Sequence, residues 1–392
     1  MTPWLLPKTF DRALFLRDYW QKKPLLIRSS GGFTDPISPD ELAGLACESI
    51  VESRLVKSDA ARTGWKVRNG PFTEKDLSSL PPTHWSLLVQ AVDQWHEGVR
   101  DMLREFDFIP RWRIDDVMIS VASDGGGVGP HFDYYDVFLI QGLGRKRWQL
   151  GGAVDSQSPL LPDTDLRLLK NFEPQEDWIV EPGDILYLPP NLAHYGIAIG
   201  DSVTYSIGFR TPSVAEILDD FSAALVQDLP PDLRYIDSDP QLPARPGELH
   251  TDVAEQILAL VRTQLLDKRR AGRWFGRYMT SPKYPELSNA SAEPLSVQAL
   301  LQYLNEGEVL LRNPAARLAF TDHDDGADLY ADGHLLPCSK ALGALLPQLC
   351  DPFTEPVDWL DAFLASTEGA RLMTDLYNHG CLYLADDEES DD

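Results

Sequence analysis

The sequence predicts an α+β chain in which an antiparallel β core, a sandwich or a barrel, lies between helical segments. Between residues 107 and 210, short β-rich segments alternate with Gly, Pro, Asp and Asn, which is typical of antiparallel strands joined by turns. On both sides of this region, apolar residues recur at helical spacing. The chain has 392 residues, 43% of them hydrophobic, and is therefore long enough for two or three domains with cores of their own.

The N-terminal segment is expected to form helices and one short strand. Residues 9–22 place apolar residues at helical spacing, and the run KPLLIRSS that follows indicates a strand. Further packing helices are expected around Pro39–Ser53 and Pro82–Phe106. The first twenty residues lack the continuous apolar stretch and the small-residue cleavage site of a secretory signal, which predicts a cytoplasmic protein.

The strands of the core are expected in the segments DDVMISVAS, YYDVFLIQG, KRWQLGG, WIVEPGDILYLPP, HYGIAIGD and SVTYSIGFR. After Pro212 the pattern becomes helical, first in SVAEILDDFSAALVQDL and then, beyond a Pro/Asp-rich break, over His250–Arg270. The second stretch has more apolar residues than one packed face needs. It is either a helical hairpin that joins domains or dimerises, or an ordinary buried helix.

A small α+β module is expected after a second linker at 280–294. Its helices are expected near 296–305, 339–348 and 357–378, and its strands near 316–320, 328–331 and 381–384. The last seven residues, DDEESDD, are expected to be a solvated acidic tail.

Composition excludes several classes of protein. The formal net charge of −26 argues against direct nucleic-acid binding and favours either a basic partner or a solvated, salt-adapted surface. No apolar run reaches the roughly 18–20 residues that cross a bilayer. The four cysteines form no CxxC pair, so reduced structural thiols are expected rather than a zinc site or a disulfide framework.

The candidate metal ligands are His131, Asp133 and His194. The first two form an H-x-D pair at the start of a strand, where a period of two points both side chains to one face, and His194 follows 63 residues after His131. Two imidazoles and one carboxylate form the facial triad of non-haem Fe(II) oxygenases, which leaves positions for a co-substrate and dioxygen. The alternative is a chance H-x-D with an ordinary histidine. A second H-x-D, at His323, lies in an acidic loop without β context and is not expected to bind metal.

Lys146 is the candidate for the co-substrate. A hairpin between Val137–Gln141 and Lys146–Leu150 would bring this cation back toward the metal, where it could pair with a carboxylate. Alternation along the strand turns Lys146 away from Arg145 and Arg147; the alternative is a solvated basic strand end. The glycine run at 125–129 lacks the GK[ST] of a phosphate loop and is expected to let the backbone approach the metal pocket closely.

The pieces FLRDYWQKKPLLIR, GGGVGPHFDYYDVFLIQGLGRKRWQL, EPGDILYLPPNLAHYG and YSIGFR resemble the JmjC-domain 2-oxoglutarate oxygenases. Among these, the sequence is most similar to the bacterial ribosomal oxygenases of the YcfD/RoxA type, which hydroxylate an arginine of a large-subunit ribosomal protein. The resemblance implies a double-stranded β-helix, the cupin-like jelly roll. It also implies a JmjC catalytic domain over 1–212, a helical dimerisation segment over 213–280 and a winged-helix-like domain with the acidic tail over 281–392.

The resemblance also implies residue roles. His131, Asp133 and His194 would bind Fe(II), and Lys146, where close relatives often have Arg, would hold the distal carboxylate of 2-oxoglutarate. Further hydrogen bonds to the co-substrate would come from Ser120 and Thr204, although Thr204 replaces an expected Asn. The arginine pocket would be lined by Asp116, Met118, Tyr135 and Ser206.

The implied reaction consumes dioxygen and 2-oxoglutarate and yields succinate, CO2 and a hydroxylated side chain of a basic ribosomal protein, with the enzyme a homodimer. The alternatives are a histidyl hydroxylase or lysine demethylase of the same group, and a cupin-like scaffold that binds a basic protein without turnover. Residues 296–392 hold four Lys/Arg against 19 Asp/Glu, a balance suited to docking a cationic protein, although salt adaptation explains it as well.

Overall fold

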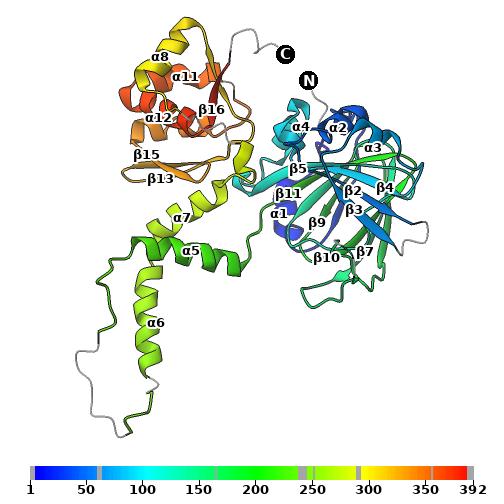
Figure 1. Cartoon of the computed structure of the whole chain (residues 1–392), viewed down its shortest axis with the longest axis horizontal. Coiled ribbons are helices and arrows are strands. Elements are labelled where there is room, and N and C mark those ends of the chain that lie inside the picture. Colours follow the sequence, from blue (N-terminus) through cyan, green and yellow to red (C-terminus); the bar gives the residue numbers. More distant parts are fainter. Residues whose placement is uncertain are drawn as a thin grey trace. The chain divides into compact units, whose positions relative to one another are not determined.

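The computed structural model describes residues 5–385 except 60–63, 163, 165, 237–244, 250–251, 288–292 and 355 (Figure 1). It divides into two compact units, 1–211 and 212–392. The expected division of the second part at residue 280 stays a prediction, and the acidic tail lies outside the described residues. No helix in the described part of the chain is long and apolar enough to span a bilayer.

The first unit is built mainly of strands. Its helices and 3-10 turns are α1 (Arg12–Asp18), α2 (Pro39–Leu45), α3 (Glu74–Ser78), η1 (Val92–Gln94), α4 (Glu97–Asp101), η2 (Met102–Phe106) and η3 (Arg111–Arg113). Its strands are β1 (Leu25–Ile27), β2 (Ser53–Ser58), β3 (Trp65–Asn69), β4 (Trp85–Val89), β5 (Ile114–Ala122), β6 (Val137–Gln141), β7 (Arg145–Ala153), β8 (Glu176–Val180), β9 (Ile185–Leu188), β10 (Leu192–Ile199) and β11 (Ser202–Phe209).

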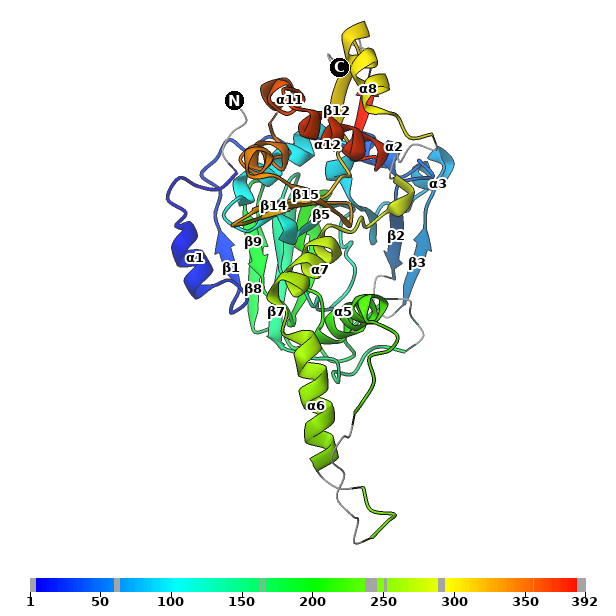
Figure 2. The ribbon, with the colours of Figure 1, turned by 90° about the vertical axis from the view of Figure 1, so that its left-hand side faces the viewer.

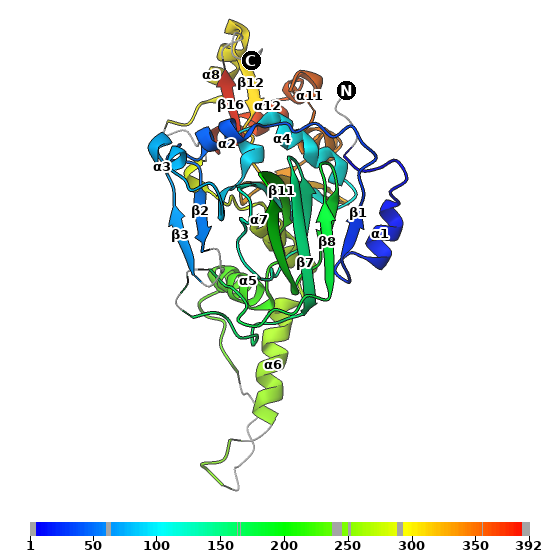
Figure 3. The ribbon, with the colours of Figure 1, turned by 90° about the vertical axis from the view of Figure 1, so that its right-hand side faces the viewer.

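These strands form two antiparallel sheets. The large sheet has the order β1-β9-β6-β11-β5-β4-β2-β3, and the small sheet has the order β10-β7-β8. Figure 3 shows the two ends of the large sheet, with β3 at one side and β1 beside α1 at the other. An apolar cluster joins residues of both sheets, among them Leu139 and Leu186 of the large sheet and Trp148, Leu150 and Val180 of the small one. The sandwich expected for residues 107–210 is confirmed, and each predicted core segment contains a strand.

The other face of the large sheet packs against aromatic residues of the N-terminal helices. Phe15 of α1 is fully buried, and its ring lies 4.8 Å from that of Tyr187 and 5.4 Å from that of Phe138. Asp11 begins the helix by accepting a hydrogen bond from the backbone N–H of Leu14. Figure 2 shows α1 alongside β1. Both faces of the central strands are therefore buried, and polar residues on the inner face are expected to have partners or a function.

The helix expected over Pro82–Phe106 is wrong at its start. Residues 85–89 form β4, which pairs with β2 on one side and β5 on the other. Ser86–Val89 are all buried, and a short continuous apolar run does not distinguish a strand from a buried helix. The antiparallel pairing of β2 with β3, the next strand in the chain, was also missed.

The second unit begins with three helices, α5 (Val214–Asp228), α6 (Asp252–Leu265) and α7 (Lys268–Thr280). The described part of the stretch expected over His250–Arg270 is helical but not continuous: one helix ends at Leu265, and Asp267 caps the next by accepting hydrogen bonds from the N–H groups of Arg269 and Arg270. None of the described residues of α6 is buried, which disagrees with the ordinary buried helix.

The rest of this unit is the expected α+β module. It comprises η4 (Pro285–Leu287), α8 (Val297–Glu306), β12 (Val309–Arg312), β13 (Leu318–His323), β14 (Gly326–Ala331), β15 (His334–Cys338), α9 (Lys340–Gly343), α10 (Leu346–Leu349), α11 (Pro356–Leu364), α12 (Thr367–Asn378) and β16 (Leu382–Ala385). The helices expected at 339–348 and 357–378 are each broken in two, the second where Ser366 caps α12. Strands β12 and β15 were not predicted.

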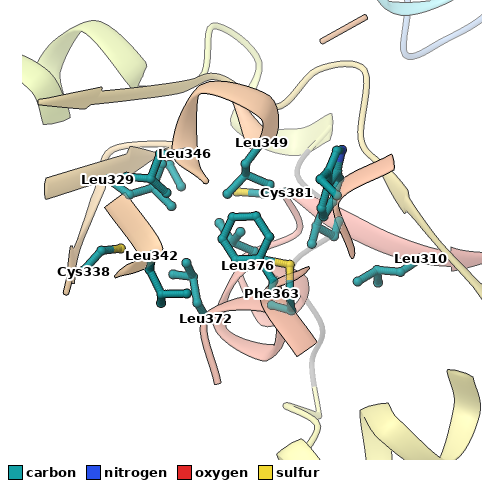
Figure 4. Packing of buried hydrophobic residues seen from close by; sticks show 14 of the residues in the cluster. Leu310, Leu329, Cys338, Leu342, Leu346, Leu349, Phe363, Leu372, Leu376 and Cys381 are labelled. Carbon is teal, nitrogen blue, oxygen red and sulfur yellow. The ribbon is translucent and has the colours of Figure 1, made fainter. Parts of the chain in front are cut away.

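This module has a hydrophobic core of its own. Leu346, Leu349, Phe363 and Leu376 are at most 1% exposed, and Figure 4 shows their side chains around a common interior. Trp359 belongs to the same cluster. The four cysteines are free thiols, as expected for a chain without a disulfide framework.

Candidate metal centre

The structure brings His131, Asp133 and His194 together. His131 lies just before β6 in a one-residue bridge with His194 of β10, and the two backbones exchange hydrogen bonds of 3.0 and 2.8 Å. Asp133 Oδ2 lies 3.6 Å from His194 Nε2. One ligand atom from each residue lies within 4.8 Å of the other two, and no other group of three or more His, Cys, Asp or Glu in the described residues does so.

Backbone carbonyls orient both imidazoles. Nδ1–H of His131 donates to the carbonyl of Gly129, and Nδ1–H of His194 donates to that of Leu192, both at 2.9 Å. Each bond fixes the tautomer and leaves the Nε2 lone pair for a metal. Burial lowers the pKa of His194 to about 4, so this ring is neutral near pH 7, the form that binds metal. The donor set fits Fe(II) in the facial triad, with several coordination positions open.

The second H-x-D motif has a different environment. His323 ends β13, and a turn at Asp324 and Asp325 leads directly into β14, so the absence of β context expected from the sequence is wrong. His323 Nε2 lies 3.7 Å from Asp328, whose carboxylate accepts two hydrogen bonds from Arg273 at 2.7 and 2.8 Å. Asp328 is thus paired with Arg273 beside His323. One histidine and one carboxylate that is already paired do not make the donor set of a metal site.

The glycine run packs between strands of the site. A side-chain carbon on Gly126 would lie 2.2 Å from the carbonyl oxygen of Trp85, and one on Gly127 would lie 2.3 Å from that of Gly196. Gly196 is in β10, two residues after His194. The close backbone approach expected from the sequence is thus present, and the carbonyl of Gly129 also holds His131.

Lys146 reaches the interior by a different route from the one expected. The hairpin between β6 and β7 is wrong: β6 pairs with β11 and β9, whereas β7 pairs with β10 and β8. The turn at 142–144 therefore crosses from the large sheet to the small one. Alternation still turns Lys146 inward, with 6% of its surface exposed, while Arg145 and Arg147 are exposed.

The ammonium group of Lys146 lies between the sheets. Its Nζ donates a hydrogen bond of 3.2 Å to Thr204 Oγ1 on β11 and lies 5.0 Å from the ring centre of Trp148. Thr204 is directly opposite Ser120 of β5, and both are buried. Burial lowers the pKa of Lys146 to about 8. A buried cation that donates a hydrogen bond to a neutral hydroxyl suits an anionic ligand.

The candidates for the arginine pocket follow the same inner face. Met118 lies opposite Ser206, and Asp116 is two residues before Met118 on β5. Asp116 is 5% exposed, and its Oδ2 accepts a hydrogen bond of 3.1 Å from the N–H of Ala91. Tyr135 is 43% exposed; the pKa of its hydroxyl is raised, first by loss of hydration and then by the neighbouring Asp133 and Asp116. Asp116, Met118 and Ser206 thus share one face of the large sheet, and Tyr135 lies close to Asp116 and to the metal ligand Asp133.

Sequence reasoning missed Gln141. This last residue of β6 is completely buried and accepts a hydrogen bond of 3.4 Å from Thr204 Oγ1. A polar amide at the end of the apolar run VFLI was the available signal, because a buried amide needs partners.

Residues 101–217 match the JmjC domain family, residues 258–383 the ROXA-like winged helix and residues 173–270 the AraC-like ligand binding domain. The ribosomal protein uL16 3-hydroxylase of Escherichia coli is 40% identical over 335 residues, which cover 84% of this chain and 87% of that protein. The chain belongs to the ribosomal oxygenase family of JmjC proteins. A probable ribosomal oxygenase of Haemophilus influenzae is 35% identical over 92% of this chain and 90% of its own length.

Solved structures of ribosomal oxygenases have the same fold. An X-ray structure of ycfD from E. coli aligns with a TM-score of 0.85 and 34% identity, covering 96% of this chain and 99% of that one. The same E. coli oxygenase in complex with cobalt and 2-oxoglutarate aligns with a TM-score of 0.82, 34% identity and coverage of 96% and 98%. The cupin-like JmjC core and the winged-helix C-terminal domain expected from the sequence are confirmed.

Proposed function

We propose that this ribosomal oxygenase uses Fe(II), 2-oxoglutarate and dioxygen to hydroxylate an arginine side chain of a basic large-subunit ribosomal protein. One dioxygen and one 2-oxoglutarate are consumed for each C–H bond converted to C–OH, with succinate and CO2 as the other products. The observation that carries the proposal is the convergence of two Nε2 lone pairs and a carboxylate near an inward lysine. The E. coli relative named as a uL16 3-hydroxylase supports the choice of substrate.

The chain's own residues would bind and orient the reactants. His131, Asp133 and His194 would hold Fe(II), which when bound supplies the activation of dioxygen. Lys146 would neutralise the distal carboxylate of 2-oxoglutarate, and Ser120 and Thr204, which lie opposite each other on β5 and β11, would add hydrogen bonds to it. Because these groups are buried, water is largely excluded from the carboxylate, and the ion pair is stronger than it would be in solvent.

Asp116 and Tyr135 would select a cationic side chain. A buried carboxylate held by the N–H of Ala91 is oriented to receive a guanidinium, and an aromatic ring beside it can stack on the guanidinium plane. This arrangement favours arginine over the uncharged histidine that a histidyl hydroxylase takes. A methylated lysine is also cationic, and the reaction product separates these cases.

The experiment measures 2-oxoglutarate turnover with added Fe(II) and a recombinant basic ribosomal protein, followed by amino-acid analysis of that protein. Wild type is expected to form succinate and hydroxyarginine, and His131→Ala and Asp133→Ala neither. His323→Ala, in the other H-x-D, is the matched control and should keep full turnover. Hydroxyhistidine alone, or formaldehyde from demethylation, contradicts the arginine assignment. Absence of iron-dependent succinate formation contradicts the oxygenase.

We also propose a cytoplasmic homodimer without direct nucleic-acid binding. Apolar residues of α6 are exposed, with Ile257 at 41%, Leu258 at 53% and Val261 at 46%, and an apolar helix face of this kind favours association with another copy. Light scattering of wild type and Val261→Glu tests the dimer; a wild-type monomer contradicts it.

The net charge of −26 supports docking of a basic protein, and a substrate KM that is independent of salt would favour salt adaptation instead.

A further inference from the structure

A relay of hydrogen bonds leads from the turn after β6 to the ammonium group of Lys146. Gln141 is completely buried at the end of β6. Its Nε2 donates to the carbonyl of Leu143 at 2.8 Å and to Ser202 Oγ at 3.0 Å. A carbonyl accepts only, so the bond to Leu143 fixes which side of the Gln141 amide carries the nitrogen.

The amide orientation sets the direction of the next two bonds. Because its nitrogen faces the turn, Gln141 presents Oε1 to Thr204, whose hydroxyl donates to it at 3.4 Å. A hydroxyl has one proton, so Thr204 Oγ1 offers only lone pairs to Lys146, which donates at 3.2 Å. Lys146, Thr204, Gln141 and the Leu143 carbonyl thus form a chain in which every bond runs in the same direction, an arrangement that strengthens each bond.

We propose that Gln141 is a positioning residue for the co-substrate: by fixing the Thr204 hydroxyl, it holds the Lys146 ammonium group where it meets the distal carboxylate of 2-oxoglutarate. This inference rests on the proposed function. A lysine side chain has four flexible carbons and needs such an anchor. Gly196 of β10 lies beside the lysine side chain: a side-chain carbon at Gly196 would be 2.9 Å from Lys146 Cε. At Gly196, β10 therefore leaves room for Lys146 but offers it no polar side chain. One N–H bond to Thr204 leaves two for a carboxylate.

The test compares two ligands of equal chain length, 2-oxoglutarate and 2-oxopentanoate, which lacks the distal carboxylate. Their affinities for the Co(II)-loaded protein are measured by calorimetry, without turnover, for wild type, Gln141→Met and Gln149→Met. Gln149 is in β7, faces away from Lys146 and is the matched control. Gln141→Met should weaken 2-oxoglutarate binding about tenfold and leave 2-oxopentanoate within about twofold. Gln149→Met should change neither.

Two further variants separate positioning from a general structural role. Gln141→Glu keeps a side-chain oxygen of the same reach that accepts from Thr204, and should lose no more than about threefold in 2-oxoglutarate affinity. In a Lys146→Met background, Gln141→Met should cause no additional loss. Equal losses for both ligands, or an unchanged preference in Gln141→Met, overturn the role of Gln141. A wild type that does not prefer 2-oxoglutarate overturns the proposed co-substrate site itself.

Discussion

The affinity for 2-oxoglutarate is expected to fall as the pH rises through about 8, because Lys146 then loses its proton. Burial lowers the pKa of this lysine from 10.5 to about 8 and is the cause of the shift. Its partners on the neighbouring strands, Ala198 and Val180, carry no charge, and Thr204 is neutral. A dianionic co-substrate binds the charged form, so binding and protonation favour each other.

The size of the effect follows from the pKa of the free enzyme. With a pKa of about 8, roughly nine-tenths of the lysine is charged at about pH 7 and roughly one-tenth at about pH 9, so the affinity should fall about tenfold over this range. The fall continues until the pH reaches the higher pKa of the lysine in the complex. Below about pH 7 the affinity should level off, because the lysine is already charged.

Calorimetric titration of the Co(II)-loaded protein from about pH 6.5 to about pH 9.5 measures this profile, with 2-oxopentanoate as the ligand that does not need the cation. Lys146→Arg should flatten the profile, because a guanidinium stays charged throughout the range. Lys146→Met should be flat as well, but about 30-fold weaker or more at neutral pH, the cost of leaving the carboxylate unpaired. A tenfold fall in either variant, or a flat wild-type profile, would refute the assignment of the effect to Lys146.

Three other predictions concern the metal, the substrate pocket and the glycine run. Asp133→Ala should abolish the rise in Tm that Co(II) produces in wild type while leaving the metal-free Tm within about 2 °C, as a thermal scan with and without metal would detect. Asp116→Asn should raise the KM for a basic ribosomal protein at least about tenfold and leave the calorimetric affinity for 2-oxoglutarate unchanged; equal effects on both would contradict a pocket role. Gly126→Ala should destabilise the protein by about 1–3 kcal/mol in urea unfolding, because its methyl carbon would lie 2.2 Å from the Trp85 carbonyl oxygen; a neutral effect would show that the close approach is not needed.

The sequence predicted the parts of the fold that depend on local patterns. Each core strand is bounded by turn residues, and the period of two correctly turned Lys146 inward between Arg145 and Arg147. Strand partners depend on distant residues, and the hairpin predicted between Val137–Gln141 and Lys146–Leu150 was wrong. Trp85–Val89 was assigned to a helix because its pairing with β2 and β5 cannot be read from its own residues.

More of the candidate site than of the strand pairing around it could be predicted from the sequence. Two histidines and a carboxylate are recognised by residue type and context, whereas their approach within 4.8 Å needs the bridge between His131 and His194, 63 residues apart. Gln141 was missed because its importance lies in the direction of its hydrogen bonds. The sequence could indicate that this amide is polar and buried, but it could not identify Leu143 and Thr204 as its hydrogen-bond partners.

The sheet to which Lys146 belongs determines what holds the site together. In a hairpin, its distance from the large sheet would be set by the backbone ladder between β6 and β7. Instead, Lys146 and His194 come from the small sheet, while Ser120 and Thr204 come from the large one. Their separation is therefore set by the apolar cluster between the sheets, to which Leu139 and Leu150 belong. Because Leu150 lies directly opposite His194, the packing that sets the distance between the two sheets also sets the distance of the metal ligand His194 from the large sheet.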